Sequence, residues 1–198
     1  MFYKQKQTCK LINAITVNNY NLAKLAIENG ADVNYLDRDI ILIIYAINMA
    51  YWCYNHDFKI SYLILENNIN ARVRDINNCS LLYGAVKYKD VRLVRFLCSR
   101  YKLDPFDQTN AFNLSPLSLA IKLKFYDGII EMTKIMNHGM KQIYLNFLLL
   151  KYVEDRNVGG IDKAKNLGAK PRQPFLNGLS VYDMIYLKGD AYDMLQYI

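Results

Sequence analysis

The feature that most constrains this chain is an internal repeat with a period near 33 residues. Apolar patterns with helical spacing begin at five places, and the intervals between them are 33, 38, 35 and 65 residues, the last being close to two periods. A repeat of this length is one small supersecondary unit, which cannot bury its apolar face alone and must stack against its neighbours. The five positions are Cys9, Leu42, Ser80, Ser115 and Ser180.

Three copies share a serine directly before the apolar pattern, in residues 75–85, 113–120 and 177–185. A serine hydroxyl there can accept a hydrogen bond from the backbone N–H groups of the first helical turn, which have no partner within the helix. Pro116 follows Ser115 and fits the first helical position, because its ring fixes φ and its missing donor is not needed. The pattern predicts a helix that begins at each serine.

A second shared pattern marks the end of the other helix of each unit. It reads Glu-Asn-Gly-Ala-Asp-Val-Asn over residues 28–34 and Glu-Asn-Asn-Ile-Asn-Ala over residues 66–71. Glycine adopts the left-handed backbone region freely, and asparagine tolerates it best among the other residues, so both can stop a helix. A left-handed helix stop is predicted at Gly30, Asn68, Gly139 and Gly168.

The sequence resembles an ankyrin-repeat protein over nearly its full length. The resemblance rests on the period, on residues 75–85 as a degraded form of D-x-x-G-x-T-P-L-H-x-A, and on the G-A-D-V-N exit of residues 30–34. It implies an all-α solenoid of about six helix-turn-helix units. One of them is unmarked and has helices near residues 143–153 and 157–166. The expected single array covers residues 1–198, in units of about 8–39, 40–78, 79–112, 113–141, 142–176 and 177–198.

The pattern departs from the family at the fourth helix position, where the family usually has histidine. Tyr45, Tyr83, Ser118 and Asp183 stand there instead. We therefore expect the hydrogen bonds that join neighbouring family repeats to be replaced by less regular contacts.

Composition indicates a folded chain in a reducing, cytoplasmic compartment. Apolar residues make up 53% of the 198 residues and charged residues 22%, which is unlike a disordered chain. The start of the chain has no apolar signal-peptide core, and the longest uncharged run, residues 40–54, is shorter than a membrane span. The four cysteines form no C-x-x-C pair, so we expect reduced thiols.

No motif in the sequence predicts catalysis, a metal site or a cofactor. The two histidines, His56 and His138, have no cysteine or carboxylate partners at ligand spacing. There is no nucleophile elbow or phosphate-binding glycine loop, and Gly159-Gly160 is interpreted as the start of a helix. The chain is therefore expected not to be an enzyme.

Function is then expected on a surface, and repeat arrays offer their concave face and hairpin tips. The repeat places Lys87, Tyr88 and Lys122 on first helices facing the concavity. Aromatic and apolar side chains at such positions favour a protein partner. The alternative is that each packs against the adjacent hairpin. The candidate tip residues are Tyr35, Leu36, Arg38, Ile76, Asn77 and Phe112.

The second unit carries an insertion of about five residues around residues 50–55, rich in aromatic side chains. Insertions in repeat arrays commonly map to binding loops, and Tyr51, Trp52 and Tyr54 are residue types that dominate interfaces. Under this interpretation Tyr51 and Tyr54 are the more exposed members. The competing interpretation is a longer first helix whose aromatic side chains fill a gap between units, since tryptophan is usually well buried.

The net charge of +7 raises the question of nucleic acid. Arg92 and Arg95 lie three apart on the outer face of an amphipathic helix, followed by Arg100 and Lys102. Charge on such a face usually only solvates the helix. An acidic protein partner, or no electrostatic role, is therefore favoured over nucleic acid, and the oligomeric state is left open.

Asn, Ile, Lys and Tyr, the residues of A/T-rich codons, are abundant, with 20 Asn and 20 Ile. With the divergent repeats, this is similar to the short ankyrin proteins of poxviruses, other large DNA viruses or intracellular bacteria. That resemblance implies a module that blocks a host signalling or restriction factor in the host cytoplasm, without a C-terminal F-box. A scaffolding array inside the organism that makes it is the alternative.

Overall fold

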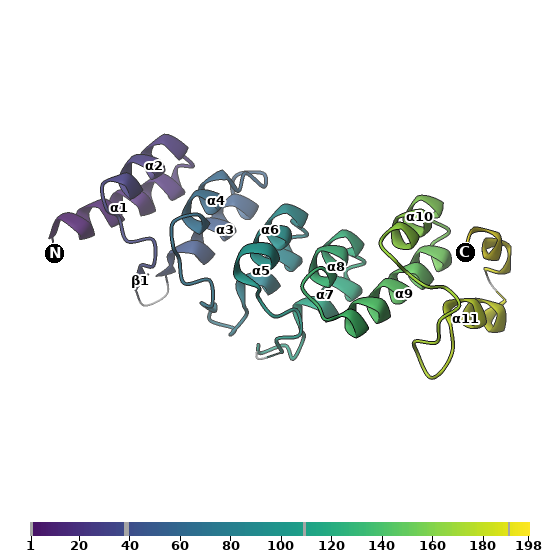
Figure 1. Ribbon diagram of the computed structural model, residues 1–198. Helices are drawn as coiled ribbons and strands as arrows, with labels where there is room; N and C mark the ends of the chain where they lie inside the picture. Colours follow the sequence, from purple (N-terminus) through teal and green to yellow (C-terminus); the bar gives the residue numbers. More distant parts are fainter. Residues whose placement is uncertain (1, 38–39, 109, 190) are drawn as a thin grey trace. The chain divides into compact units, whose positions relative to one another are not determined.

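The computed structural model describes residues 2–37, 40–108, 110–189 and 191–198, and over these residues the regular secondary structure is almost entirely helical (Figure 1). Sheet in this part is limited to the two-residue strands β1 (Leu36–Asp37) and β2 (Ile40–Ile41), which pair antiparallel, and to isolated bridges. The expected all-α class is confirmed. The chain divides into two compact units, Met1–Leu119 and Ala120–Ile198.

The first unit is a series of helix pairs. Within each pair a tight connection reverses the chain, and α1 packs on α2, α3 on α4, and α5 on α6. Neighbouring pairs also contact each other, because α1 packs on α3 and α2 on α4. The longer loops before α3 and α5 lie along the same side of the unit (Figure 1). The elements are α1 (Phe2–Thr16), α2 (Tyr20–Glu28), α3 (Leu42–Trp52), α4 (Lys59–Leu65), α5 (Leu81–Lys87), α6 (Val91–Phe96), the π-helical turn η1 (Leu97–Tyr101) and α7 (Pro116–Lys122), which crosses into the second unit.

The second unit is organised around the long helix α9, which packs against α8, α10 and α11. Gly160 in the first turn of α10 permits the α9–α10 contact, since a Cβ atom there would lie 2.3 Å from the Tyr152 ring. The glycine pair 159–160 therefore begins a helix, as the sequence suggested. The elements are α8 (Tyr126–Thr133), α9 (His138–Glu154), α10 (Val158–Asn166), α11 (Val181–Lys188) and the 3-10 helix η2 (Tyr192–Tyr197).

The same tight turn connects paired helices in both units, except α3 and α4, whose connection has two left-handed residues, Asn55 and His56. A residue with φ between 50° and 54° ends the first helix, and the next backbone N–H donates to the carbonyl five residues earlier. This is the hydrogen-bond pattern of a Schellman helix end. The left-handed residues are Asn18, Lys89, Lys124 and Arg156, and the bonds that follow them are Asn19 N to Ala14 O, Asp90 N to Ala85 O, Phe125 N to Ala120 O and Asn157 N to Tyr152 O.

Most of the predicted helix stops are confirmed. Gly30, Gly168 and Asn68 have φ of 83°, 101° and 52° at the ends of α2, α10 and α4. The prediction for Gly139 was wrong, because this residue lies inside α9. The side chain of Asn137 accepts a hydrogen bond from the Met140 N–H, so the Asn-His-Gly segment begins a helix instead of ending one.

The predicted helix starts are also largely correct. Ser80 and Ser180 cap α5 and α11, and the Ser115 hydroxyl accepts from the Ser118 N–H in the first turn of α7. Cys9 is an exception, because α1 begins at Phe2. Thr8 precedes Cys9 and is a capping residue type, but it lies inside α1, where its hydroxyl donates to the Lys4 carbonyl and accepts from the Asp32 N–H. The unmarked unit has its two helices, although α9 begins at His138 and not near residue 143.

A buried hydrogen bond of the same kind, here called a tie, occurs in each of the two compact units. The Thr8 hydroxyl of α1 accepts from the Asp32 N–H at 2.8 Å, and the Asn146 carboxamide of α9 accepts from the Lys170 N–H at 2.7 Å. Both acceptors are almost fully buried. In each bond the donor and the acceptor are 24 residues apart in the sequence. Each bond holds the segment that follows the second helix of a pair, α2 or α10, against the first helix of that pair, α1 or α9.

Candidate functional site

The candidate site is a trough in the first unit, formed by two adjoining cavities of about 250 Å³ and 500 Å³ between α3, α5 and the loop before α5. The cavities share polar and apolar lining residues, so they form one continuous surface. We call this surface the trough. The shared residues are Ile44, Asn48, Asp75, Asn77, Lys87 and Tyr88.

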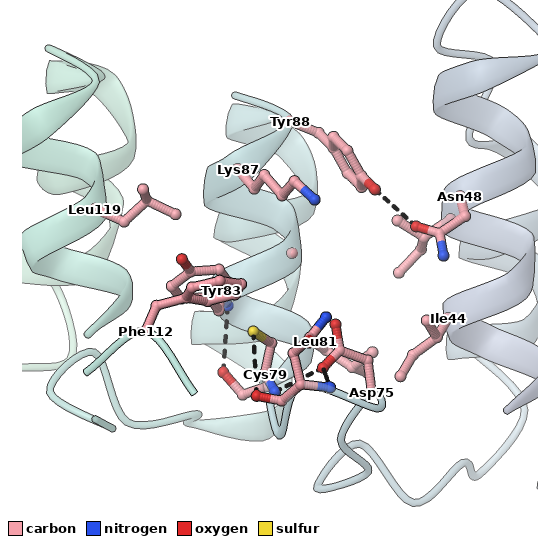
Figure 2. A pocket seen from close by; sticks show the side chains of 14 residues that line it. Ile44, Asn48, Asp75, Cys79, Leu81, Tyr83, Lys87, Tyr88, Phe112 and Leu119 are labelled. Carbon is pink, nitrogen blue, oxygen red and sulfur yellow. Dashed lines mark hydrogen bonds between the residues drawn. The ribbon is translucent and has the colours of Figure 1, made fainter. Parts of the chain in front are cut away.

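Helical periodicity explains why α3 contributes to the trough. Ile44, Asn48 and Trp52 are four residues apart, which places them on one face of α3, and all three line it. Gly84 and Tyr88 show the same spacing at α5, with Lys87 beside them. The side chains of α3 and α5 point towards one another across the cavity in Figure 2.

Tyr88 organises the floor of the trough. It is buried, its hydroxyl donates to Asn48 Oδ1 at 2.7 Å, and its ring stacks on Tyr51 with centroids 4.0 Å apart. Burial raises the pKa of Tyr88, and a hydrogen bond from the Trp52 indole opposes this rise. The hydroxyl therefore stays protonated at neutral pH and acts as a fixed donor.

The loop end of the trough is held by Asp75. Its carboxylate accepts from the backbone N–H groups of Asn77 and Cys79 at 2.9 and 2.8 Å (Figure 2). Burial and the neighbouring Asp75 raise the pKa of the Cys79 thiol to about 11. The thiol is therefore protonated at neutral pH and is a poor nucleophile.

The far side of α5 is apolar. The Tyr83 ring lies nearly parallel to the Phe112 ring at a centroid distance of 6.3 Å, and Leu119 of α7 completes this side (Figure 2). The Ala111 N–H donates to the Asn77 carbonyl at 2.9 Å, which connects the loop carrying Phe112 to the preceding hairpin.

Large apolar side chains on the rim of the trough remain in solvent. Leu36 is 68% exposed, Trp52 71%, Ile76 88% and Phe112 55%. Single exposed apolar residues are common, but a group of them around one depression is typical of an interaction surface.

The trough contains seven of the twelve candidate residues from the sequence. Asn77 and Lys87 are exposed, whereas Tyr88 is buried and so contributes mainly to the floor. The seven are Leu36, Trp52, Ile76, Asn77, Lys87, Tyr88 and Phe112.

Four other candidates do not line the trough. Tyr35 is half-buried and its backbone carbonyl accepts from Leu42, Tyr54 donates its hydroxyl to the Thr16 carbonyl, and Tyr51 lies behind Tyr88. Lys122 is exposed on α7. Arg38 lies outside the described residues.

The insertion around residues 50–55 lengthens α3 in the first unit. The helix continues to Trp52, and Tyr51 packs between the Tyr88 and His56 rings, so part of this segment fills space between helices. The expected order of exposure was wrong. Tyr51 and Tyr54 are half-buried, while Trp52 is exposed because it falls on the face of α3 that lines the trough.

Sequence analysis missed Ile44, Asn48, Asp75 and Tyr83. The spacing of four residues back from Trp52 would have found Asn48 and Ile44 once α3 was known to reach Trp52. Asp75 and Tyr83 were noted only as repeat positions.

The basic residues considered for nucleic acid lie elsewhere. Arg92 and Arg95 are exposed on α6, and Arg100 is exposed on η1. None of them lines the trough. In the part of the chain described here, no three His, Cys, Asp or Glu side chains are grouped to hold a metal ion, and no helix is long and apolar enough to cross a bilayer.

Comparison of the sequence with models of known protein families found no match, and comparison with curated proteins found no match either.

Proposed function

We propose that the chain is an ankyrin-type array of about six helix-turn-helix units that binds a protein partner through the trough and has no catalytic activity. The recurring Schellman turn and the paired Thr8 and Asn146 ties support the repeat architecture. The observation that carries the binding function is the exposed apolar rim around a depression between packed helices.

The chemistry of the trough favours binding over reaction. Its thiol is protonated, its tyrosine hydroxyl is committed to Asn48, and its carboxylate to its own loop. The rim residue types include the tryptophan and other large apolar groups that contribute much of the free energy of protein association. That the partner is a host signalling or restriction factor, met in the host cytoplasm, follows from the resemblance to short viral and bacterial ankyrin proteins.

A comparison of bait variants tests this function. The wild-type chain and a W52A/I76E variant are used to capture proteins from nuclease-treated lysates of animal cells and, separately, of candidate source organisms. A Y186A/L187E variant is the matched control, because these residues are exposed apolar side chains of α11 outside the trough.

The expected result is a protein retained by the wild type and the control and lost by W52A/I76E. Retention from animal lysate alone supports a host factor, and retention from the source organism alone supports scaffolding. Equal retention by all three baits would contradict a role for the trough.

A further inference from the structure

One residue that lines the trough is an exposed cation, Lys87. In the described part of the chain no carboxylate lies within ion-pair distance of the Lys87 ammonium, which lies 5.4 Å from the centroid of the adjacent Tyr88 ring. Its side chain extends from the last turn of α5 into the space facing α3 (Figure 2). By contrast, Arg74, the other basic residue lining the trough, pairs with Asp107 at 2.6 Å.

A second unmatched donor lies on the facing helix. The Tyr88 hydroxyl donates to Asn48 Oδ1 at 2.7 Å, and a carboxamide oxygen can only accept. The oxygen of the Asn48 carboxamide is therefore already bonded within the protein. The Nδ2 group of Asn48 has no acceptor among the described residues, and Asn48 lines both cavities.

The surroundings of these two donors are apolar on one side and acidic on the other. Ile47, Leu81 and Leu119 line the smaller cavity, whose volume of about 250 Å³ accommodates one or two side chains. Asp75 lies at the opposite end of α5 from Lys87, before the helix begins (Figure 2). The carboxylate of a ligand is therefore attracted at the Lys87 end of the trough and repelled at the Asp75 end.

We propose that the trough binds a partner polypeptide at an acidic residue next to an apolar residue. The carboxylate of that residue accepts from Lys87 Nζ and Asn48 Nδ2, and the apolar side chain enters the cavity between Ile44 and Leu81. This inference rests on the proposed protein-binding function and adds the chemistry that the partner must carry. The overall charge of +7 has the sign that attracts such a segment.

The rim identifies the ligand as a polypeptide and not a free small acid. Leu36, Trp52 and Ile76 extend the apolar surface beyond the smaller cavity into the larger one. A small acid that fills about 250 Å³ would leave these side chains in water, whereas an extended chain covers them.

Selection from a random dodecapeptide display library tests the proposal. We expect the wild-type chain to enrich peptides with Asp or Glu beside Leu, Ile or Phe. The K87E variant should lose these peptides and enrich Lys or Arg at the same place. The matched control is K10E, which makes the same charge change at an exposed lysine of α1 outside the trough. Thermal midpoints of all three chains verify that they fold.

Failure of the two proposals gives different results. Enrichment of apolar peptides without acidic residues, or an acidic preference that K87E retains, overturns the carboxylate site and leaves protein binding intact. No enrichment with any chain, although all are folded, overturns both.

Synthetic peptides then locate the carboxylate. Replacing the acidic residue of an enriched peptide by its amide, or Lys87 by Gln, should weaken binding about tenfold, as expected for loss of a charge-assisted hydrogen bond. The combined change should cost little more than either alone. The side-chain amide signal of Asn48 in ¹⁵N-labelled protein should shift with the acid peptide and not with the amide. Competition by 3-phenylpropionate at the peptide's own concentration would assign the site to a small acid and overturn the polypeptide ligand.

Discussion

The charged side chains at the end of α9 in the second unit have ion-pair partners, whereas Lys87 in the trough of the first unit has none among the described residues. In the second unit, Glu154 lies between two lysines, 2.6 Å from Lys151 and 2.5 Å from Lys188, and Asp155 accepts from Lys124 and Tyr126. In the trough of the first unit, the described residues supply no ion-pair partner for Lys87 and no acceptor for the Asn48 amide nitrogen, and apolar side chains lie in solvent. The carboxylates at the end of α9 are thus paired within their own unit, whereas the trough leaves donors and apolar surface for a ligand.

The largest expected difference in stability is between a substitution at a buried residue of α5 and one at an exposed residue on the rim of the trough. Leu82 of α5 is fully buried and Ile76 is 88% exposed. We expect L82A to lower the free energy of unfolding by about 3 kcal/mol, because it loses burial and leaves a cavity. I76A should change it by less than about 0.5 kcal/mol. Urea unfolding followed by circular dichroism measures both. A large loss for I76A would show that the rim belongs to the core.

A similar contrast exists inside the second unit. G160A should destabilise by about 1–2 kcal/mol, because the new methyl group overlaps the Tyr152 ring and the two helices must separate. G139A in α9 is the control, since a Cβ there would meet only Asn137 Oδ1, at an ordinary contact distance of 3.7 Å. Denaturant midpoints that move together for the two variants would mean that α9 and α10 do not pack as described.

The ion pairs of the second unit predict a pH dependence. Burial alone would raise the pKa of Glu154, but hydrogen bonds from Lys151 and Lys188 outweigh it, and the pKa lies below its usual value. The carboxylate therefore stabilises the fold at neutral pH, and this stabilisation disappears as the pH falls through the folded-state pKa.

E154Q should accordingly cost about 0.5–1 kcal/mol at pH 7, since the lysines are partly exposed and solvent screens them. The difference from the wild type should shrink as the pH falls through the lowered folded-state pKa of Glu154. Thermal melts at several pH values check this, and a constant difference across pH would assign the effect to packing.

A small gain in stability at Gly84 should separate effects on folding from effects on binding. Gly84 lies in α5, faces the trough and has open space where a Cβ would stand. G84A should raise stability by about 0.5–1 kcal/mol through helix propensity and yet weaken peptide binding, because the methyl group narrows the cavity. G139A should give the same gain in stability with binding unchanged. Tighter binding by G84A would contradict the trough as the site.

The sequence predicted the features that depend on a few adjacent residues. Serine caps at Ser80 and Ser180 and left-handed stops at Gly30 and Gly168 are local, and each was found. Gly139 failed because the same three residues that can end a helix can also cap the next one. Lys89, Lys124 and Arg156 end helices in the left-handed region without any local signal, since their conformation is imposed by the packed helix pair.

The candidate site was predicted in outline only. Exposed tip residues such as Ile76 and Phe112 followed from the repeat register alone. The Asn48–Tyr88 bond joins residues 40 apart, so it depends on how two helix pairs pack. No pattern within one unit contains that information. The exposure of Trp52 likewise depends on the length that the insertion adds to α3.

Trp52 is the only tryptophan of the chain, and it lies on the rim of the trough. The protein therefore carries an intrinsic fluorescent probe at the place where a ligand is expected. Its emission should resemble that of indole in water and move to shorter wavelength when a segment covers it, without any label. The same probe reports on one unit only. Fluorescence and circular dichroism measured in a single denaturation would coincide if the chain melts as one body, and would diverge if Ala120–Ile198 melts on its own.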